Sequence, residues 1–97
     1  MNALSFSAIA AMNMREQKIR QDKTIHIGEN IRRLRLERGM GQADLLIKMQ
    51  LEGSEITRET LFRMEKGLQH IPASQLRLLR DILRTTYDEL LRDRQHP

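Results

Sequence analysis

The sequence predicts an all-α domain of five short helices. Apolar residues recur at intervals of three and four, which is the spacing of one face of a helix. No useful length of chain alternates apolar with polar residues, and no hairpin signal is present, so we expect no strands. Glycines and capping residues separate the periodic stretches, which keeps each predicted helix short.

The first predicted helix covers residues 27–38 and ends at Gly39. Its apolar stripe follows the i, i+4, i+7 pattern and consists of Ile27, Ile31 and Leu34. Arg35 lies one step from this stripe, where a partly covered guanidinium needs a carboxylate partner. The one acidic residue that we expect to face inward is Glu65, so the sequence predicts an Arg35–Glu65 ion pair.

A second helix is expected over residues 42–51, with Leu45, Leu46 and Met49 as its inward set and Gly53 as its stop. Residues 52–56 then connect it to a third helix.

The third predicted helix covers residues 58–66, and both of its ends are marked. Thr57 suits the N-cap, because its hydroxyl can accept a hydrogen bond from a first-turn amide. Gly67 suits the C′ position, where a left-handed conformation carries no Cβ penalty. Ile56 and Leu61 stand at the positions of a hydrophobic staple.

This third helix has two unlike sides. Leu61, Met64 and Glu65 share one side, and the Leu61 and Met64 side must pack on the domain because so short a helix is unstable alone in water. The other side presents charged and planar groups, namely Glu59, Phe62, Arg63 and Lys66. Such a face suits a helix that lies in the major groove of DNA.

Two helices complete the predicted fold. The fourth begins at Ala73 or Ser74, after Pro72, and runs to Arg84. The fifth covers residues 87–92 and begins with a capping box of Thr86 and Glu89. Apolar residues left over for a dimer contact are Leu78, Leu90, Leu91 and the N-terminal stripe.

The chain of 97 residues is expected to hold one domain, over residues 26–92, with an arm over 1–25 and a tail over 93–97. The arm starts with an apolar stripe, and a segment dense in charge follows. One interpretation makes the stripe a dimer contact and the charged segment a basic arm on the DNA backbone. The other interpretation is a frayed tail.

Composition narrows the function classes. The 17 Lys and Arg against 13 Asp and Glu give a net charge of +4, and there is no cysteine for a disulfide or a thiolate site. No apolar run approaches the ~18–20 residues of a membrane span. The weakly apolar N-terminus lacks the positive residues that open a secretion signal, so we expect a cytoplasmic protein that does not enter a membrane.

The sequence gives no sign of an enzyme. His26, His70 and His96 are scattered without metal-ligand spacing. No paired carboxylates, Ser-His constellation or Gly-rich phosphate loop can be placed in a pocket. We therefore expect no catalytic residues, no metal and no cofactor.

Three segments together resemble a known family: IGENIRRLRLERGMGQADLL, ITRETLFRMEKG and LRLLRDILRTTYDELL. They look like the Cro and phage-repressor-like helix-turn-helix family, often called XRE-type, over residues 27–91. In that family Gln begins the second helix, and a recognition helix opened by Ser, Thr or a β-branched residue ends in hydrophobic-Glu-x-Gly. Gln42, Thr57 and the run from Met64 to Gly67 hold those places here.

The resemblance implies a compact five-helix, lambda-repressor-like domain that is usually dimeric on DNA. It implies that Gln42 touches a phosphate, that Arg58, Glu59 and Arg63 reach base edges, and that Thr57 and Thr60 lie near the backbone. Phe62 could touch a thymine methyl group. The expected DNA-binding set is Gln42, Thr57, Arg58, Glu59, Thr60, Phe62, Arg63 and Lys66.

Two features depart from the family pattern. The connection between the second and third helices is longer than the usual turn, and Leu46 stands where a small alanine normally lets these helices cross closely. We interpret these as one change, in which a larger side chain holds the helices apart and the longer connection spans the gap.

The function predicted from these observations is that of a sequence-specific DNA-binding transcriptional regulator, a repressor that acts as a homodimer on double-stranded DNA. A different class stays open: an antitoxin-like or adaptor protein that binds a protein partner through the same helices.

Overall fold

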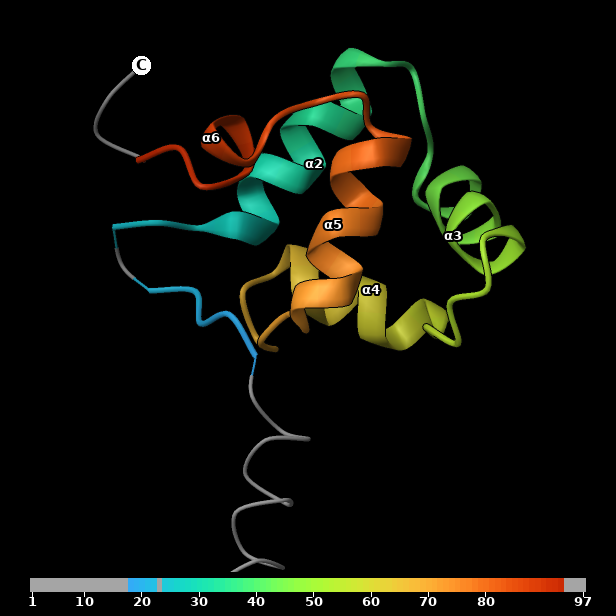
Figure 1. The fold of residues 1–97 in the computed structure, drawn as a ribbon, viewed down its shortest axis with the longest axis horizontal. Coiled ribbons are helices and arrows are strands. Elements are labelled where there is room, and N and C mark those ends of the chain that lie inside the picture. Colours follow the sequence, from blue (N-terminus) through green and yellow to red (C-terminus); the bar gives the residue numbers. More distant parts are fainter. Residues whose placement is uncertain (1–17, 23, 94–97) are drawn as a thin grey trace, which may run out of the picture.

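Five α-helices and their connections make up the part of the chain that the structure, a computed structural model, describes: residues 18–22 and 24–93 (Figure 1). They are α2 (Ile27–Glu37), α3 (Gln42–Leu51), α4 (Arg58–Glu65), α5 (Ala73–Ile82) and α6 (Tyr87–Leu90). No strand occurs within these residues, so the predicted all-α, five-helix fold is confirmed. The N-terminal helix or arm was expected over residues 1–25, and residues 1–17 of it lie outside the described part of the chain.

The helix bounds follow the local signals closely. The observed bounds of α3 are the predicted ones, whereas α2, α4, α5 and α6 each end one or two residues earlier than predicted. In each case the residue that follows the helix is its C-cap, and a difference of one or two residues is ordinary at a helix end. No helix in the described part has the length and apolar character to cross a bilayer.

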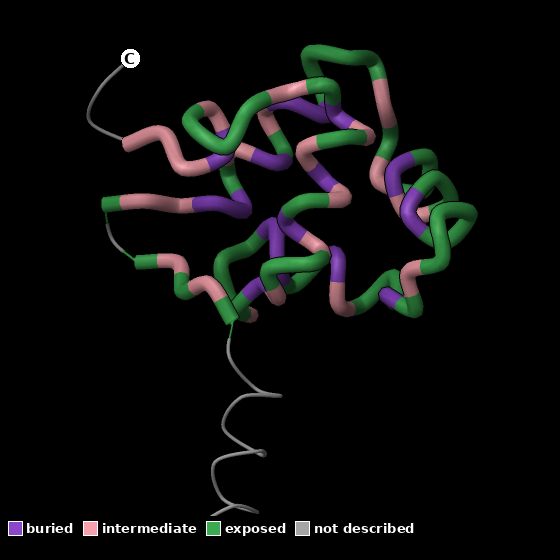
Figure 2. The backbone as a smooth tube through the Cα atoms, viewed as in Figure 1, coloured by how far each residue is buried: buried purple, intermediate pink, exposed green. Residues whose placement is uncertain are grey.

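A single apolar core lies between the helices. Figure 2 shows the buried stretches of backbone gathered on the inner sides of the helices. The helix α4 packs against both α2 and α3, and α5 packs against α3. Residues from every helix and from both long loops contribute to the core: Ile27, Ile31, Leu34, Leu45, Met49, Ile56, Leu61, Met64, Ile71, Leu76, Leu79, Leu83 and Leu90.

Both ends of α4 are closed by the expected devices. The Thr57 hydroxyl accepts a hydrogen bond from the Thr60 amide at 3.2 Å. At the other end Gly67 has a φ of 76°, and the Leu68 amide donates to the Arg63 carbonyl at 2.9 Å. This is the Schellman arrangement, which satisfies the last carbonyls of a helix. The length and direction of α4 are therefore fixed locally.

The long connection before α4, residues 52–57, is tied down at its centre. The Ser54 hydroxyl donates to Gln75 Oε1 of α5 at 2.7 Å and accepts from the Ile56 amide at 3.1 Å. Gln50 of α3 donates to the Ile56 carbonyl at 3.1 Å. Ile56 is buried, and Leu46 is partly buried against the core. The connection over residues 52–57 is therefore held by hydrogen bonds to both α3 and α5.

Residues 18–22, which the sequence places in the arm, pack against the domain. Ile19 and Ile71 pair through their backbones, with N–O distances of 2.7 and 3.1 Å. Gln21 Nε2 donates to the Met64 carbonyl at 2.9 Å, and the Gly28 amide donates to Gln21 Oε1 at 2.7 Å. A single glutamine side chain therefore joins the start of α2 to the end of α4.

The helix α6 closes the described part against α2. Asn30 Nδ2 donates to the Leu90 carbonyl at 2.8 Å, and the Leu90 side chain is fully buried. The expectation that Leu90 offers apolar surface to a dimer was wrong, because the turn into α6 points this side chain into the core. Leu78 and Leu91 are partly buried.

Replacing Arg84 with glycine is expected to stabilise the domain. Arg84, the second residue after α5, has a φ of 50°, in the left-handed region, whereas the glycines Gly39, Gly53 and Gly67 take this place after α2, α3 and α4. The left-handed conformation costs a non-glycine residue about 1–2 kcal/mol, and the greater freedom of glycine in the unfolded chain offsets part of the gain. Arg84→Gly should raise the free energy of unfolding by about 0.5–1 kcal/mol, measured by urea denaturation.

Arg84→Ala is the control for this change, because it removes the same side chain and keeps the strained backbone. It should bring no gain. Equal effects of the two variants would assign the result to the side chain rather than to the left-handed conformation.

Candidate nucleic-acid interface

The outward face of α4 is exposed as the sequence predicts. The side chains of Arg58, Glu59 and Arg63 are exposed and have no hydrogen bond or ion pair with any described residue. Leu61, Met64 and Glu65 are buried on the other side. The helix therefore presents two guanidinium groups and one carboxylate that are ready to pair with an external ligand.

Phe62 and Lys66 lie together on the same face. Phe62 is 48% exposed, although phenylalanine side chains are usually buried. Lys66 Nζ lies 5.5 Å from the centre of the Phe62 ring. This cation–π distance holds the ammonium group close to the ring. The pair offers a flat apolar surface with a positive charge beside it.

Thr57 and Thr60 mark the N-terminus of α4. Thr57 is exposed and Thr60 is partly exposed, and their hydroxyl oxygens lie 2.9 Å apart. Because Thr57 also caps the helix, both side chains are held against the backbone and reach less far than Arg58. Their positions suit contacts at the rim of a ligand rather than deep in a groove.

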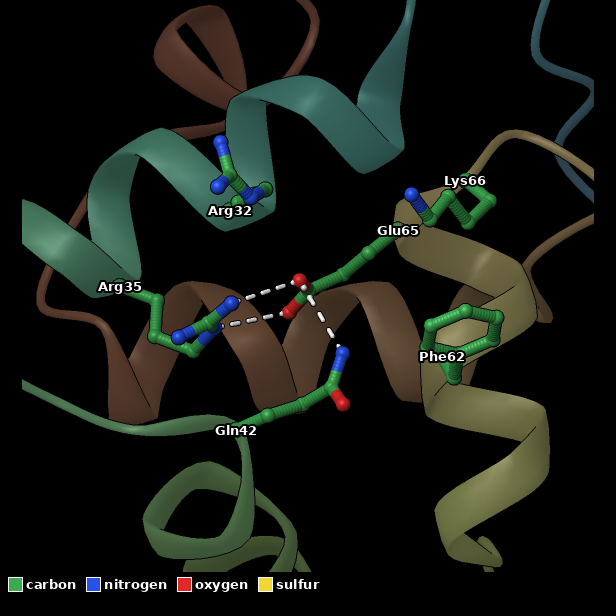
Figure 3. Close-up of a pocket in the computed structure, with 6 residues that line it drawn as sticks. All are labelled: Arg32, Arg35, Gln42, Phe62, Glu65 and Lys66. Atoms are coloured by element: carbon green, nitrogen blue, oxygen red, sulfur yellow. Dashed lines mark hydrogen bonds and ion pairs between the residues drawn. The ribbon is translucent and has the colours of Figure 1, made fainter.

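A buried ion pair supports this face from behind (Figure 3). Arg35 Nε donates to Glu65 Oε2 at 2.9 Å, and Arg35 Nη2 donates to Glu65 Oε1 at 2.8 Å. These two bonds are the bidentate arrangement of a guanidinium with a carboxylate. The side chains are 8% and 4% exposed. The two residues expected to pair from their helix positions therefore join α2 to α4 directly.

The ion pair also reaches the loop before α3 and the first residue of α3. Arg35 Nη1 donates to the Met40 carbonyl at 3.0 Å, and Gln42 Nε2 donates to Glu65 Oε1 at 3.3 Å. The hydrogen bonds to Glu65 raise the pKa of Arg35, against the opposite effect of its burial, so the guanidinium stays charged. Gln42 is thereby held at the N-terminus of α3, beside the outward face of α4.

A pocket of about 200 Å³ opens where α2, α3 and α4 meet. Figure 3 shows Arg32 on α2 and Lys66 directly after α4, with the carboxylate of Glu65 between them. Its lining residues are Arg32, Arg35, Gln42, Phe62, Glu65 and Lys66. Three of these carry a positive charge and one a negative charge, which favours an anion.

Arg32 is the residue of this pocket that the sequence-based prediction missed. It is exposed and lies three residues before Arg35, so the two side chains share one face of α2. That spacing is the signal that could have identified it. The structure places Gln42, Phe62 and Lys66 with it around one opening, while Arg58 and Glu59 stand further along α4.

No family model matches this chain, and neither a curated protein nor a solved structure matches it. The geometry of α4 and of the pocket beside it is therefore the basis on which a function can be assigned.

Proposed function

We propose that this protein is a sequence-specific DNA-binding regulator of transcription, of the helix-turn-helix kind that its sequence resembles. The observation that carries the proposal is the outward face of α4, where Arg58, Glu59 and Arg63 are exposed and unpaired among the described residues. Arginine commonly donates two hydrogen bonds to guanine, and a glutamate can accept from cytosine. Such a helix placed in the major groove reads base edges.

The remaining contacts in this proposal go to the DNA backbone. Gln42, Arg32 and Lys66 surround the cationic pocket and bind phosphate, while Thr57 and Thr60 lie along the rim. Phe62 contacts a thymine methyl group. Two copies of α4 in a homodimer reach successive major grooves about 34 Å apart, and occupation of the site represses transcription by excluding other proteins.

Salt dependence distinguishes this proposal from the alternative of an antitoxin-like or adaptor protein. Phosphate contacts release counterions, so DNA affinity should fall by orders of magnitude between about 50 and 200 mM salt. An apolar protein interface should change little over this range. A DNA duplex obtained by selection from a random pool is the ligand, and failure to select any preferred sequence would reject sequence-specific binding.

Arg63→Ala should weaken binding to the selected duplex by about 1–3 kcal/mol and relax the preference at one base pair. The reason is the loss of a bidentate contact with one base. Binding is measured by fluorescence anisotropy against duplexes changed at one position at a time. The control is Arg77→Ala, which removes an exposed arginine from α5 and should leave affinity unchanged.

A uniform loss across all duplexes would contradict base reading by Arg63. It would make this residue a phosphate contact instead.

Arg32→Ala is expected to give that uniform loss. In the proposal its guanidinium faces a phosphate across the pocket from Lys66, so the variant should weaken all duplexes alike. The slope of log affinity against log salt should fall by about 1, which corresponds to one phosphate contact. An unchanged slope would remove Arg32 from the interface.

A further inference from the structure

The outer face of α3 carries apolar side chains that the fold leaves uncovered. Ile47 is 54% exposed and Leu51 is 80% exposed, and they stand one turn apart on the same face of the helix. We call these two residues the α3 ridge. An apolar ridge of this kind is a candidate protein-contact surface.

A groove runs along each side of the α3 ridge. One groove has a volume of about 490 Å³, and Met40, Ile47 and Leu51 contribute its apolar lining. The other groove has a volume of about 450 Å³ and lies between α3 and α5, and Leu51, Leu78 and Ile82 contribute its apolar lining. The α3 ridge with a groove beside it has the shape of the surfaces that pack when two helical faces meet.

The charges around the groove between α3 and α5 are balanced. Lys48 and Arg84 supply two positive groups, and Glu52 and Asp81 supply two negative groups. Asp81 Oδ1 forms an ion pair with Arg80 Nη2 at 2.8 Å. Lys48, Glu52 and Arg84 have no ion pair with any described residue. The groove therefore carries charges of both signs, which is a poorer match for a polyanion than for a protein surface of mixed charge.

If two copies are related by a two-fold axis, the positive and negative groups around this groove can be complementary between the copies. When the same surface is used by both copies, each cation of one copy can face a carboxylate of the other. The whole chain carries a net charge of +4, so two copies repel elsewhere on their surfaces. A surface where exposed apolar side chains lie among charges of both signs is the place where a second copy is least opposed.

We propose that the α3 ridge and the groove between α3 and α5 form a two-fold contact with a second copy of this chain. Leu51 of each copy seats between Leu78 and Ile82 of the other, and Lys48 and Arg84 face carboxylates of the second copy. No residue of α4 lines either groove, so the contact uses none of the residues that face outward from α4. The contact stands independently of DNA binding.

Sedimentation velocity of the full chain without DNA tests this contact. The unchanged protein should show a concentration-dependent dimer. Leu51→Glu should raise the dimer dissociation constant at least about tenfold, because a carboxylate would take the place of an apolar side chain that the contact buries between Leu78 and Ile82. Ile47→Glu should act in the same direction. Circular dichroism should show that both variants keep their helices, since these side chains are exposed.

Leu36→Glu is the matched control. Leu36 is 51% exposed on α2 and lines neither groove, so this variant should dimerise like the unchanged protein. A monomer at every concentration, a Leu51→Glu variant that dimerises normally, or a Leu36→Glu variant as impaired as Leu51→Glu would each overturn the proposal. None of these outcomes depends on whether the protein binds DNA.

Discussion

Gly28→Ala should destabilise the domain by more than about 3 kcal/mol, a large effect for the addition of one methyl group. A Cβ atom at this position would overlap the Met64 carbonyl oxygen and would lie 2.8 Å from the Glu65 carbonyl oxygen. Both obstacles are backbone atoms, which cannot rotate away as a side chain can. The variant folds only if α2 moves away from α4.

That movement would break contacts on both sides of Gly28. The Gly28 amide donates to Gln21 Oε1, and Gln21 Nε2 donates to the Met64 carbonyl, so the Gln21 side chain links the start of α2 to the end of α4. The two hydrogen bonds from Arg35 to Glu65, at 2.9 and 2.8 Å, also join α2 to α4. Separation of α2 from α4 therefore weakens several interactions at once, and the loss should exceed that of a single bond.

Gly41→Ala is the matched control for the added methyl group. Its Cβ would meet only the Asp44 side chain, with Oδ2 at 3.2 Å, and this side chain can move. The expected loss is about 1 kcal/mol, because Gly41 is the N-cap of α3, where alanine is less favourable than glycine, and its φ of −73° is open to alanine. Urea denaturation followed by circular dichroism measures both variants. A Gly28→Ala midpoint equal to that of Gly41→Ala would show that the close approach is not needed.

The helices could be predicted because their signals are local. Thr57 and Gly67 delimit α4 through hydrogen bonds that span only three to five residues. The Arg35–Glu65 pair could be predicted for a related reason, since each residue lies beside the apolar stripe of its own helix. A charge so close to a buried stripe needs an opposite charge nearby.

The contacts of Gln21 and Gly28 could not be predicted in this way. Gln21 bonds to a carbonyl 43 positions later, and nothing around it in the sequence distinguishes it from a residue of a charged arm. Gly28 reads as an ordinary position near the start of a helix, although a Cβ atom there would overlap the backbone at the end of α4. Contacts between distant segments depend on packing, which no local pattern encodes.

The DNA contacts remain predictions for a different physical reason. They depend on a second molecule, and the domain alone fixes only which side chains are available to it. Arg58 and Arg63 are available, and Gln42 is held in place by Glu65 at 3.3 Å. The pocket adds Arg32, which neither the helical pattern nor the family resemblance had singled out.

Glu65→Ala is expected to cost about 3–5 kcal/mol in the free energy of unfolding. It leaves the Arg35 guanidinium in a site where its side chain is only 8% exposed, with the Met40 carbonyl as its remaining bond in the described part of the chain. Since the hydrogen bonds to Glu65 raise the pKa of Arg35, the stability that this pair contributes is lost only above the ordinary arginine range, as long as the Glu65 carboxylate is charged. The loss should therefore be the same at pH 6 and pH 9 when measured by urea denaturation.

Two further variants identify the cause of that loss. Glu59→Ala removes an exposed glutamate from the same helix and should change stability by no more than about 0.5 kcal/mol. Arg35→Met combined with Glu65→Leu removes both charges and keeps the volume, so it should recover most of the stability. If this double variant were as unstable as Glu65→Ala, an unpaired charge could not be the cause. The bidentate geometry itself would then be what holds α4 against α2.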